Sequence, residues 1–216
     1  MAEPPQRGLR DYIAWHRAYD DPESALSRRL VAVQDHIRDA LDARPGPFRA
    51  LSACSGDGRD LLDVLAVRED ADRVEAILLE AHRGIADQAR RRAAEAGLAA
   101  VEVRTVDAGQ TRSYLGAVPA DLVLLVGIFG NIADEDIHTT IRALPQFCCS
   151  GATVVWSRGR EDRDLGAQIR EWFGEVGCAE LAYRTWPDSS AGVGATRFLG
   201  QPEPLHLDRR LFTFLR

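Results

Sequence analysis

From residue 47 onward, short apolar runs alternate with helical patterns, and this alternation limits the folds that the chain can adopt. Apolar runs typical of buried strands occur at 48–54, 74–80, 100–107, 121–127 and 151–158. Helical patterns follow four of these runs, at 59–67, 82–97, 134–147 and 165–177. Strands that are joined through helices pair in parallel by right-handed crossovers. The pattern therefore predicts an α/β protein with a mostly parallel central sheet.

The end of the chain departs from this alternation. Three strand-like segments, 178–186, 193–200 and 209–216, follow one another with only turn-rich sequence between them. Consecutive strands without a crossover helix pair antiparallel or leave the sheet. We therefore expect an antiparallel C-terminal hairpin at one edge of the sheet, which is flanked by helices.

Residues 1–46 are expected to form a helical extension that packs on the domain formed by 47–216. Asp21 is a plausible N-cap with Pro22 at the first helical position. One face of the helix is apolar and carries Leu26, Leu30, Val33, Ile37 and Leu41. The preceding segment 11–20 has Tyr12, Trp15, His16 and Tyr19 at helical spacing. This segment either covers one side of the sheet or forms a lid over a pocket.

Charge and composition exclude several classes of function. The net charge is −6, which disfavours binding to nucleic acid or to anionic membranes. The sequence contains no lysine, as codon bias in a GC-rich bacterial genome would produce, and this removes every mechanism that needs a Schiff-base lysine. The four cysteines include no Cys-x-x-Cys pair, and the histidines lack zinc-like spacing, so no metal site is expected. With no apolar signal or membrane span, we expect a cytoplasmic protein.

Candidate ligand-binding residues occur at the ends of the first three predicted strands. Ligands of open parallel sheets bind beyond the carboxyl ends of the strands. After the first strand, Gly56 and Gly58 remove side chains where a backbone can approach a ligand. Glu80 ends the second strand, 22 positions after Gly58, and Asp107 ends the third. Carboxylates at these positions can accept hydrogen bonds from ribose hydroxyls and from an exocyclic amine, or can cap a helix.

Four segments resemble the motifs of class I S-adenosylmethionine-dependent methyltransferases, and the resemblance extends over residues 48–216. LSACSGDG (51–58) resembles the glycine-rich first motif, ILLEAHRGIADQAR (77–90) the second, VRTVDAG (103–109) the third and ADLVLLVGIFGNI (120–132) the fourth. The resemblance implies a Rossmann-like seven-stranded sheet and S-adenosylmethionine as the cofactor. It also implies a cofactor site formed by Ser52, Cys54, Ser55, Gly56, Asp57, Gly58, Glu80, Ala81, Asp107, Ala108, Gly127 and Ile128.

The resemblance gives these residues different roles. Glu80 corresponds to the acid that binds the ribose, and Asp107 lies beside adenine. Ser52 stands where the family has an acid that commonly helps to hold the methionyl amino group, and Cys54 stands where it has its first glycine. Either Asp57 or a backbone carbonyl takes over the missing contact. Because Gly58 is expected to lie against the ligand, Gly58→Val should obstruct the site with little loss of fold.

The expected reaction is an in-line transfer of the methyl group, which depends mainly on positioning. No residue is assigned as a general base, and His16 and His138 are interpreted as surface or capping residues. The loop after the fourth strand lacks the Asn/Asp-Pro-Pro-aromatic sequence of enzymes that methylate nucleobase amines. We therefore expect a small-molecule acceptor and no nucleic-acid partner. Phe129 and Asn131 are candidates for the wall of the acceptor pocket, or else a core ring and a helix cap.

Two other functions are compatible with the sequence. One is a non-catalytic protein that binds S-adenosylmethionine or a partner, which the altered first motif favours. The other is a nicotinamide-dependent oxidoreductase. Its Gly-x-Gly-x-x-Gly fingerprint would need glycine where the chain has Leu61, and a Tyr-x-x-x-Lys pair cannot form without lysine.

Overall fold

A computed structural model describes residue 21 and the segments 24–159, 164–187, 189 and 191–215. The aromatic segment 11–20, with His16, therefore lies outside the described residues, as does the predicted helix position of Pro22.

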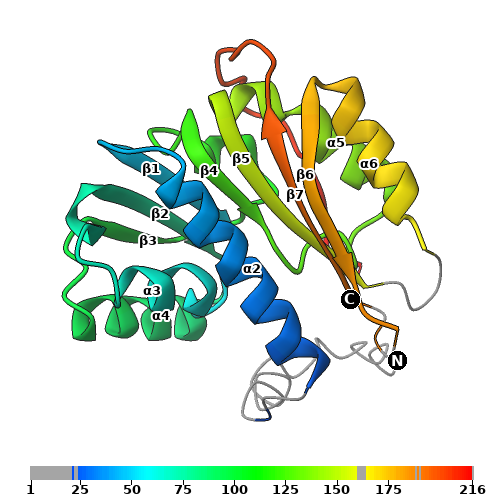
Figure 1. Ribbon diagram of the computed structural model, residues 1–216. Coiled ribbons are helices and arrows are strands. Elements are labelled where there is room, and N and C mark those ends of the chain that lie inside the picture. Colours follow the sequence, from blue (N-terminus) through cyan, green and yellow to red (C-terminus); the bar gives the residue numbers. More distant parts are fainter. Residues whose placement is uncertain (1–20, 22–23, 160–163, 188, 190, 216) are drawn as a thin grey trace, which may run out of the picture.

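Seven strands form one mixed sheet in the order β3-β2-β1-β4-β5-β7-β6 (Figure 1). The strands are β1 (Phe48–Ala53), β2 (Val74–Glu80), β3 (Val101–Thr105), β4 (Ala120–Leu125), β5 (Cys148–Gly159), β6 (Cys178–Thr185) and β7 (Ala191–Phe198). The first five pair in parallel, whereas β7 lies antiparallel to both β5 and β6. The predicted parallel sheet with an antiparallel C-terminal hairpin is confirmed.

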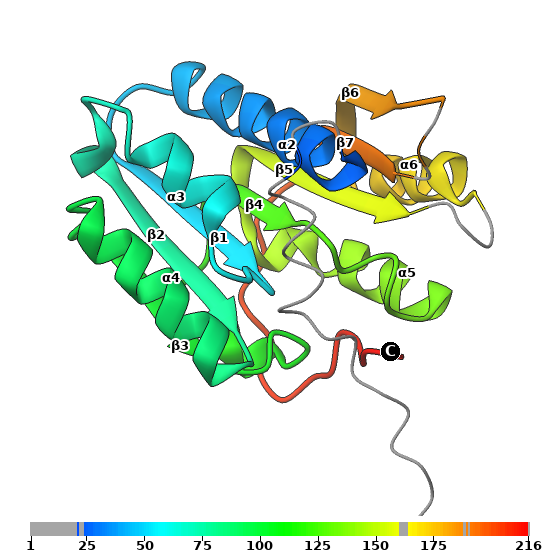
Figure 2. The ribbon, with the colours of Figure 1, turned by 90° about the horizontal axis from the view of Figure 1, so that it is seen from below.

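The two faces of the sheet carry separate hydrophobic clusters. One cluster joins the sheet to α2 (Ala25–Asp42), α3 (Arg59–Leu65) and α4 (Arg83–Glu95). The other joins it to α5 (Asp134–Arg142), α6 (Gly166–Glu175) and the short 3-10 helices η3 (Thr111–Tyr114) and η4 (Leu144–Gln146). A further 3-10 turn, η2 (Ala71–Arg73), precedes β2. Figures 1 and 2 show this arrangement, with α2 in front of the sheet in Figure 1.

The N-cap of helix α2 lies three residues after Asp21, the residue that was predicted to cap it. Ser24 is the N-cap, and its Oγ accepts a hydrogen bond from the Ser27 N–H at 3.0 Å. Serine caps a helix as well as aspartate does, so Ser24 can take the place that was predicted for Asp21. On the predicted apolar face, Val33, Ile37 and Leu41 are fully buried. The helix packs against α3, β5 and β7.

The prediction of a strand at 209–216 is wrong. In this segment the described residues make only isolated bridges, Gln110 with Arg210 and Ile132 with Phe214. Leu211 and Phe212 are neighbours in sequence and are both buried, which a strand with a single buried face does not allow. They fill the layer beside η3, where the connection between β3 and β4 provides only a short 3-10 helix. Figure 2 shows this C-terminal segment, in red, running along the sheet to the end of the chain.

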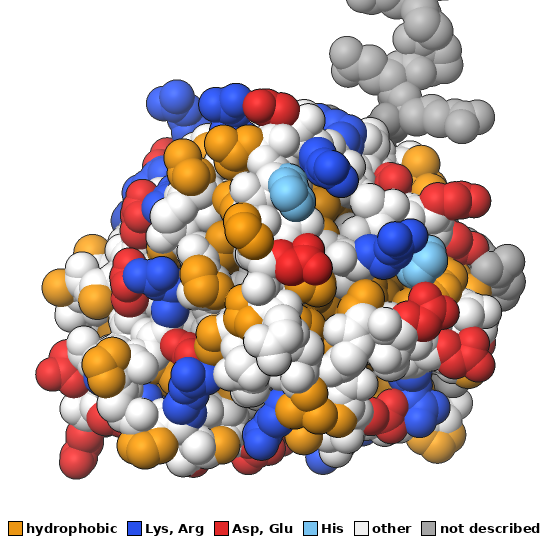
Figure 3. Space-filling view, turned by 90° about the horizontal axis from the view of Figure 1, so that it is seen from above, with side chains coloured by type: hydrophobic (Ala, Val, Ile, Leu, Met, Phe, Trp, Pro, Cys, Tyr) orange, Lys and Arg blue, Asp and Glu red, His pale blue; other side chains and the backbone are white. Residues whose placement is uncertain are grey.

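Among the described residues, no helix combines the length and the apolar character that crossing a membrane requires. The face in Figure 3, opposite to that in Figure 2, carries acidic side chains and arginines interspersed with apolar ones. Many charged side chains of the described residues are paired across short distances, as in Arg49 with Glu75 at 2.9 Å and Arg90 with Asp87 at 2.6 Å.

Candidate functional site

The loop between β1 and α3 forms a tight turn at the carboxyl edge of the sheet. Its backbone is fixed by hydrogen bonds from Ser55 N–H to Leu79 O and from Gly58 N–H to Ser55 O, each of 3.0 Å. Gly56 and Gly58 have positive φ angles of 59° and 74°. Cys54 also has a positive φ, 52°, so it keeps the backbone conformation that glycine would adopt there. For a side-chain-bearing residue this costs about 1–2 kcal/mol.

Glu80 joins the end of β2 to this loop. Its Oε2 accepts a hydrogen bond from Gly56 N–H at 3.0 Å, and its Oε1 accepts one from His82 N–H at 2.7 Å. Two backbone donors therefore fix the plane of the carboxylate. A carboxylate has about four acceptor positions, so each oxygen can still accept another hydrogen bond.

The third strand end meets the first two at Cys54. Burial raises the pKa of the Cys54 thiol, and the neighbouring charges of Glu80 and Asp107 raise it further. The pKa of Tyr114 is also raised, first by burial and then by Cys54 and Asp107. The Tyr114 hydroxyl donates to Ala108 O at 2.8 Å. Three strand ends that are far apart in sequence thus lie near one partly buried thiol, which is protonated at neutral pH.

Asp107 is bound by the C-terminal segment, a contact that the sequence analysis did not find. Its Oδ1 accepts from Gly109 N–H at 2.8 Å, and its Oδ2 accepts from Arg210 Nη2 at 2.9 Å. Backbone hydrogen bonds from Leu211 N–H to Gly109 O and from Thr111 N–H to Arg209 O hold the segment in place. The only signal in the sequence was a pair of arginines before an apolar dipeptide. The Asp107 side chain remains half exposed.

The loop after β4 is fixed by side chains from its surroundings. Gly127 N–H donates to Ser157 Oγ at 2.9 Å, and Asn131 Nδ2 donates to Gly127 O at 2.8 Å. Ile128 and Phe129 are fully buried. Phe129 packs against Trp156 with ring centroids 6.2 Å apart, so it is a core ring rather than a pocket wall. The N-cap of α5 is Ala133, so Asn131 is not the cap of that helix.

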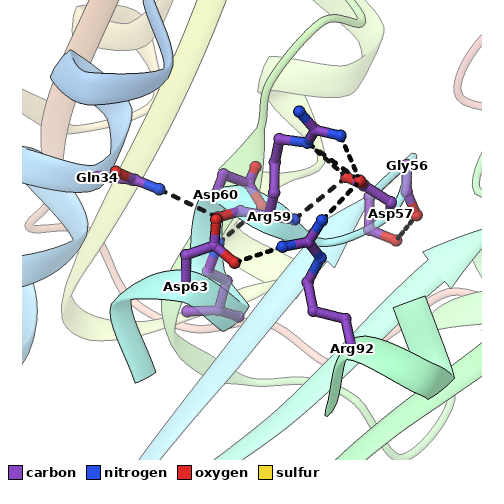
Figure 4. A network of polar contacts seen from close by, with 9 residues as sticks. Gln34, Gly56, Asp57, Arg59, Asp60, Asp63 and Arg92 are labelled. Atoms are coloured by element: carbon purple, nitrogen blue, oxygen red, sulfur yellow. Dashed lines mark hydrogen bonds and ion pairs between the residues drawn. The ribbon is translucent and has the colours of Figure 1, made fainter. Parts of the chain in front are cut away.

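The Asp57 side chain points from the loop toward α3 and α4 (Figure 4). Its carboxylate accepts from Arg59 Nη2 at 2.6 Å and from Arg92 Nη2 at 3.2 Å, and Arg92 also pairs with Asp63 at 2.7 Å. Burial alone would raise the pKa of Asp57. The hydrogen bonds and charge of Arg59, together with the charge of Arg92, outweigh burial and hold the pKa below its ordinary value. The acid beside the glycines is thus engaged by two guanidinium groups.

Asp57→Asn is expected to lower the free energy of unfolding at pH 7 by about 2 kcal/mol, because two guanidinium groups lose a buried anionic partner. The lowered pKa means that this stabilisation is present above the ordinary aspartate pKa of about 3.9 and is lost as the pH falls below it. Denaturant unfolding between pH 7 and pH 3 measures the difference from the wild type.

Asp87→Asn is the matched control for this variant, because Asp87 pairs with Arg90 on the surface of α4. An exposed pair contributes at most about 1 kcal/mol. If the two substitutions cost the same, or if the cost of Asp57→Asn does not change with pH, the burial of the Asp57 network does not stabilise the protein as we describe.

The other residues that the sequence analysis assigned to the site differ in exposure. Ser52 is buried and lies beside Leu78 of β2 and Leu124 of β4, both in the cluster on the α2–α3 side of the sheet. Ala108 is also buried, whereas Ala81 is exposed. The Ser55 hydroxyl donates only a long hydrogen bond, of 3.4 Å, to Gly56 O.

His138 lies at the contact between α5 and α6. Its Nε2 is 3.2 Å from Glu175 Oε2, and its ring stacks on Trp172 with centroids 4.9 Å apart. These contacts agree with the interpretation of His138 as a surface residue that joins two helices.

Comparison with known proteins identifies the fold. The sequence matches no family model and no curated protein. A solved magnesium protoporphyrin IX methyltransferase from Synechocystis with bound S-adenosylmethionine is 13% identical and has a TM-score of 0.65, over 86% of this chain and 90% of that one. A putative Escherichia coli methyltransferase, yhhF, is 16% identical with a TM-score of 0.57, over 79% and 88%. A Salinibacter ruber RNA methyltransferase with S-adenosylhomocysteine is 18% identical with a TM-score of 0.51, over 82% and 96%. This chain therefore has the Rossmann-like fold that these methyltransferases share.

Proposed function

We propose that the chain binds S-adenosylmethionine at the carboxyl edge of the sheet and transfers its methyl group to a small acceptor molecule. The observation that supports this best is the meeting of three strand ends. Glu80 holds the glycine loop through Gly56, and the charges of Glu80 and Asp107 both act on the Cys54 thiol. The likeness in fold to proteins solved with this cofactor or its product supports the same function.

The chemistry of these groups fits an adenosine. Vicinal ribose hydroxyls offer two donors, and the fixed Glu80 carboxylate has acceptor positions left on both oxygens. An exocyclic amine is a donor as well, and Asp107 is a half-exposed acceptor at the next strand end. The turn at 54–58 has two glycines at positive φ, where a ligand can approach the backbone closely.

When bound, S-adenosylmethionine supplies a methyl group that its sulfonium already activates. The chain's own residues then have to hold the cofactor and the acceptor in line, which can account for most of the rate of such a reaction. Glu80 and Asp107 would orient the adenosine, while the backbone at Gly127 and Ile128 would border the methyl side. No residue is proposed as a base.

The shared fold does not discriminate between classes of acceptor. The structural neighbours include a protein named for a porphyrin and another named for RNA, so they do not support the expected exclusion of nucleic acid. We propose a small molecule because the net charge of −6 disfavours a polyanion.

Calorimetry with S-adenosylhomocysteine tests cofactor binding, with a nicotinamide dinucleotide as the competing ligand. Transfer of labelled methyl groups to a panel of small molecules and to RNA tests catalysis and the acceptor class. We expect micromolar binding of S-adenosylhomocysteine and labelling of a small molecule. Binding without turnover on any acceptor would favour a non-catalytic binding protein, labelling of RNA would overturn the small-molecule assignment, and preference for the dinucleotide would overturn the proposal as a whole.

A further inference from the structure

Residue 52 is a serine, so a different group has to bind the ammonium of the methionyl end if the proposed function is correct. Two carboxylates follow it in the loop and the first turn of α3, Asp57 and Asp60. Asp57 is already engaged by Arg59 and Arg92. A carboxylate that holds two guanidinium groups has little capacity left for a third cation.

Asp60 lies on the same side of the sheet as Ser52 and at the same edge. Ser52 is the last but one residue of β1, and its register partners belong to the cluster beneath α2 and α3. Asp60 is in the first turn of α3, directly behind the loop that leaves β1. Gln34 of α2 donates to Arg59 O at 3.1 Å and so fixes α2 against this turn.

The Asp60 carboxylate is buried without an ion pair to any described residue. Only 8% of the residue is exposed, and its Oδ1 accepts a hydrogen bond from Leu61 N–H at 2.8 Å. Burial raises the pKa of Asp60 to about 6. The charge of Asp57 raises it further, while Arg29 of α2 and the backbone N–H groups of Leu61 and Asp60 lower it. A buried carboxylate of this kind is costly unless a cation lies beside it.

We propose that Asp60 replaces the missing acid and accepts a hydrogen bond from the α-ammonium group of the methionyl end of S-adenosylmethionine. This inference rests on the proposed function. The buried Asp60 carboxylate would gain a cationic partner, and the methionyl ammonium would gain an acidic partner that Ser52 does not provide. Binding then depends on pH, because the ammonium needs the ionised form of Asp60.

The test compares two ligands that share an adenosine. S-adenosylhomocysteine has the amino-acid end, whereas 5′-methylthioadenosine does not. We expect Asp60→Asn to weaken binding of S-adenosylhomocysteine more than tenfold in calorimetry and to change binding of 5′-methylthioadenosine less than twofold. Asp63→Asn is the matched control, because Asp63 lies on the same helix, has a side chain that is 41% exposed and pairs with Arg92. It should change neither affinity more than twofold.

Two further measurements separate binding from folding. The apparent melting temperature of ligand-free Asp60→Asn should exceed that of the wild type by several degrees at pH 7.5, because the pKa raised to about 6 makes ionised Asp60 destabilising above that pH. In the wild type, the preference for S-adenosylhomocysteine over 5′-methylthioadenosine should fall as the pH decreases through 6. In Asp60→Asn this preference should not depend on pH.

Several outcomes would overturn the inference. Equal losses for the two ligands in Asp60→Asn would mean that Asp60 has a structural role. No loss for either ligand would mean that Asp60 does not contact the ammonium. A wild-type preference that does not depend on pH would have the same meaning, and this measurement needs no variant to fold. If wild-type protein binds neither ligand, the proposed function fails; if it binds both and only the Asp60 results fail, the proposed function is retained.

Discussion

Gly58→Val is expected to destabilise the fold by about 3–5 kcal/mol, rather than only to obstruct ligand binding. A Cβ at position 58 would lie 2.7 Å from Leu78 Cδ2 and 2.8 Å from Leu62 Cδ1, and both leucines are fully buried. The residue is also the N-cap of α3, at a φ of 74°. The expectation that this substitution spares the fold is therefore wrong. We therefore expect the core beneath the loop to exclude a side chain at position 58, whether or not a ligand binds there.

Gly97→Val separates the two causes of this loss. Gly97 has a similar φ of 70°, but a Cβ there would meet nothing within 4 Å. Its cost should therefore be the backbone strain alone, about 1–2 kcal/mol. Denaturant unfolding of both variants measures the difference. Equal losses would show that the contacts with Leu62 and Leu78 relax at no cost and that only the left-handed backbone excludes side chains at position 58.

Glu80→Ala is expected to weaken binding of S-adenosylhomocysteine more than tenfold. The substitution removes the acceptor proposed for the ribose hydroxyls and also releases the N–H groups of Gly56 and His82 that the carboxylate holds. Glu80→Gln should have a smaller effect, because the amide keeps one acceptor oxygen in the same place. Calorimetry on the wild type and on both variants gives the ratio of affinities.

Glu75→Ala is the control for this pair of variants. Glu75 lies on the same strand, but it is exposed and pairs with Arg49 at the start of β1. The substitution should leave the affinity unchanged within a factor of two. An affinity that survives Glu80→Ala, or one that falls equally in Glu75→Ala, would remove the assignment of Glu80 to the ribose.

The order of the elements could be predicted because each one depends on local periodicity. The apolar runs 74–80 and 121–127 have the length of strands buried on both faces. Strand β2 occupies the first run in full, and β4 occupies the second as far as Leu125. The face of 134–147 that carries Ile137, Ile141 and Leu144 is indeed buried, although α5 ends at Arg142. Pro145 does not continue the helix.

The hairpin at the end of the chain was predictable for the same reason, but the segment 209–215 was not. Its apolar residues suit a strand, yet the layer beside η3 accommodates Leu211 and Phe212 together. Whether the segment forms a strand or buries both residues depends on how much space the connection between β3 and β4 leaves. That space is a property of the assembled fold. The ion pair between Arg210 and Asp107 follows from the same packing.

The candidate site also has features that the sequence predicts and others that only the tertiary structure decides. Local sequence was enough to mark Gly56, Glu80 and Asp107, because strand ends in a parallel sheet meet at one edge whatever the rest of the chain does. Whether a nearby carboxylate is available depends on the atoms around it. Asp57 and Asp60 are three residues apart, and the sequence alone does not show which of the two carboxylates is available to a ligand. Arg59 of α3 and Arg92 of α4 neutralise Asp57. Asp60 is buried and has a backbone N–H as its hydrogen-bond partner. The two carboxylates differ because burial and charge pairing depend on neighbours that are distant along the chain.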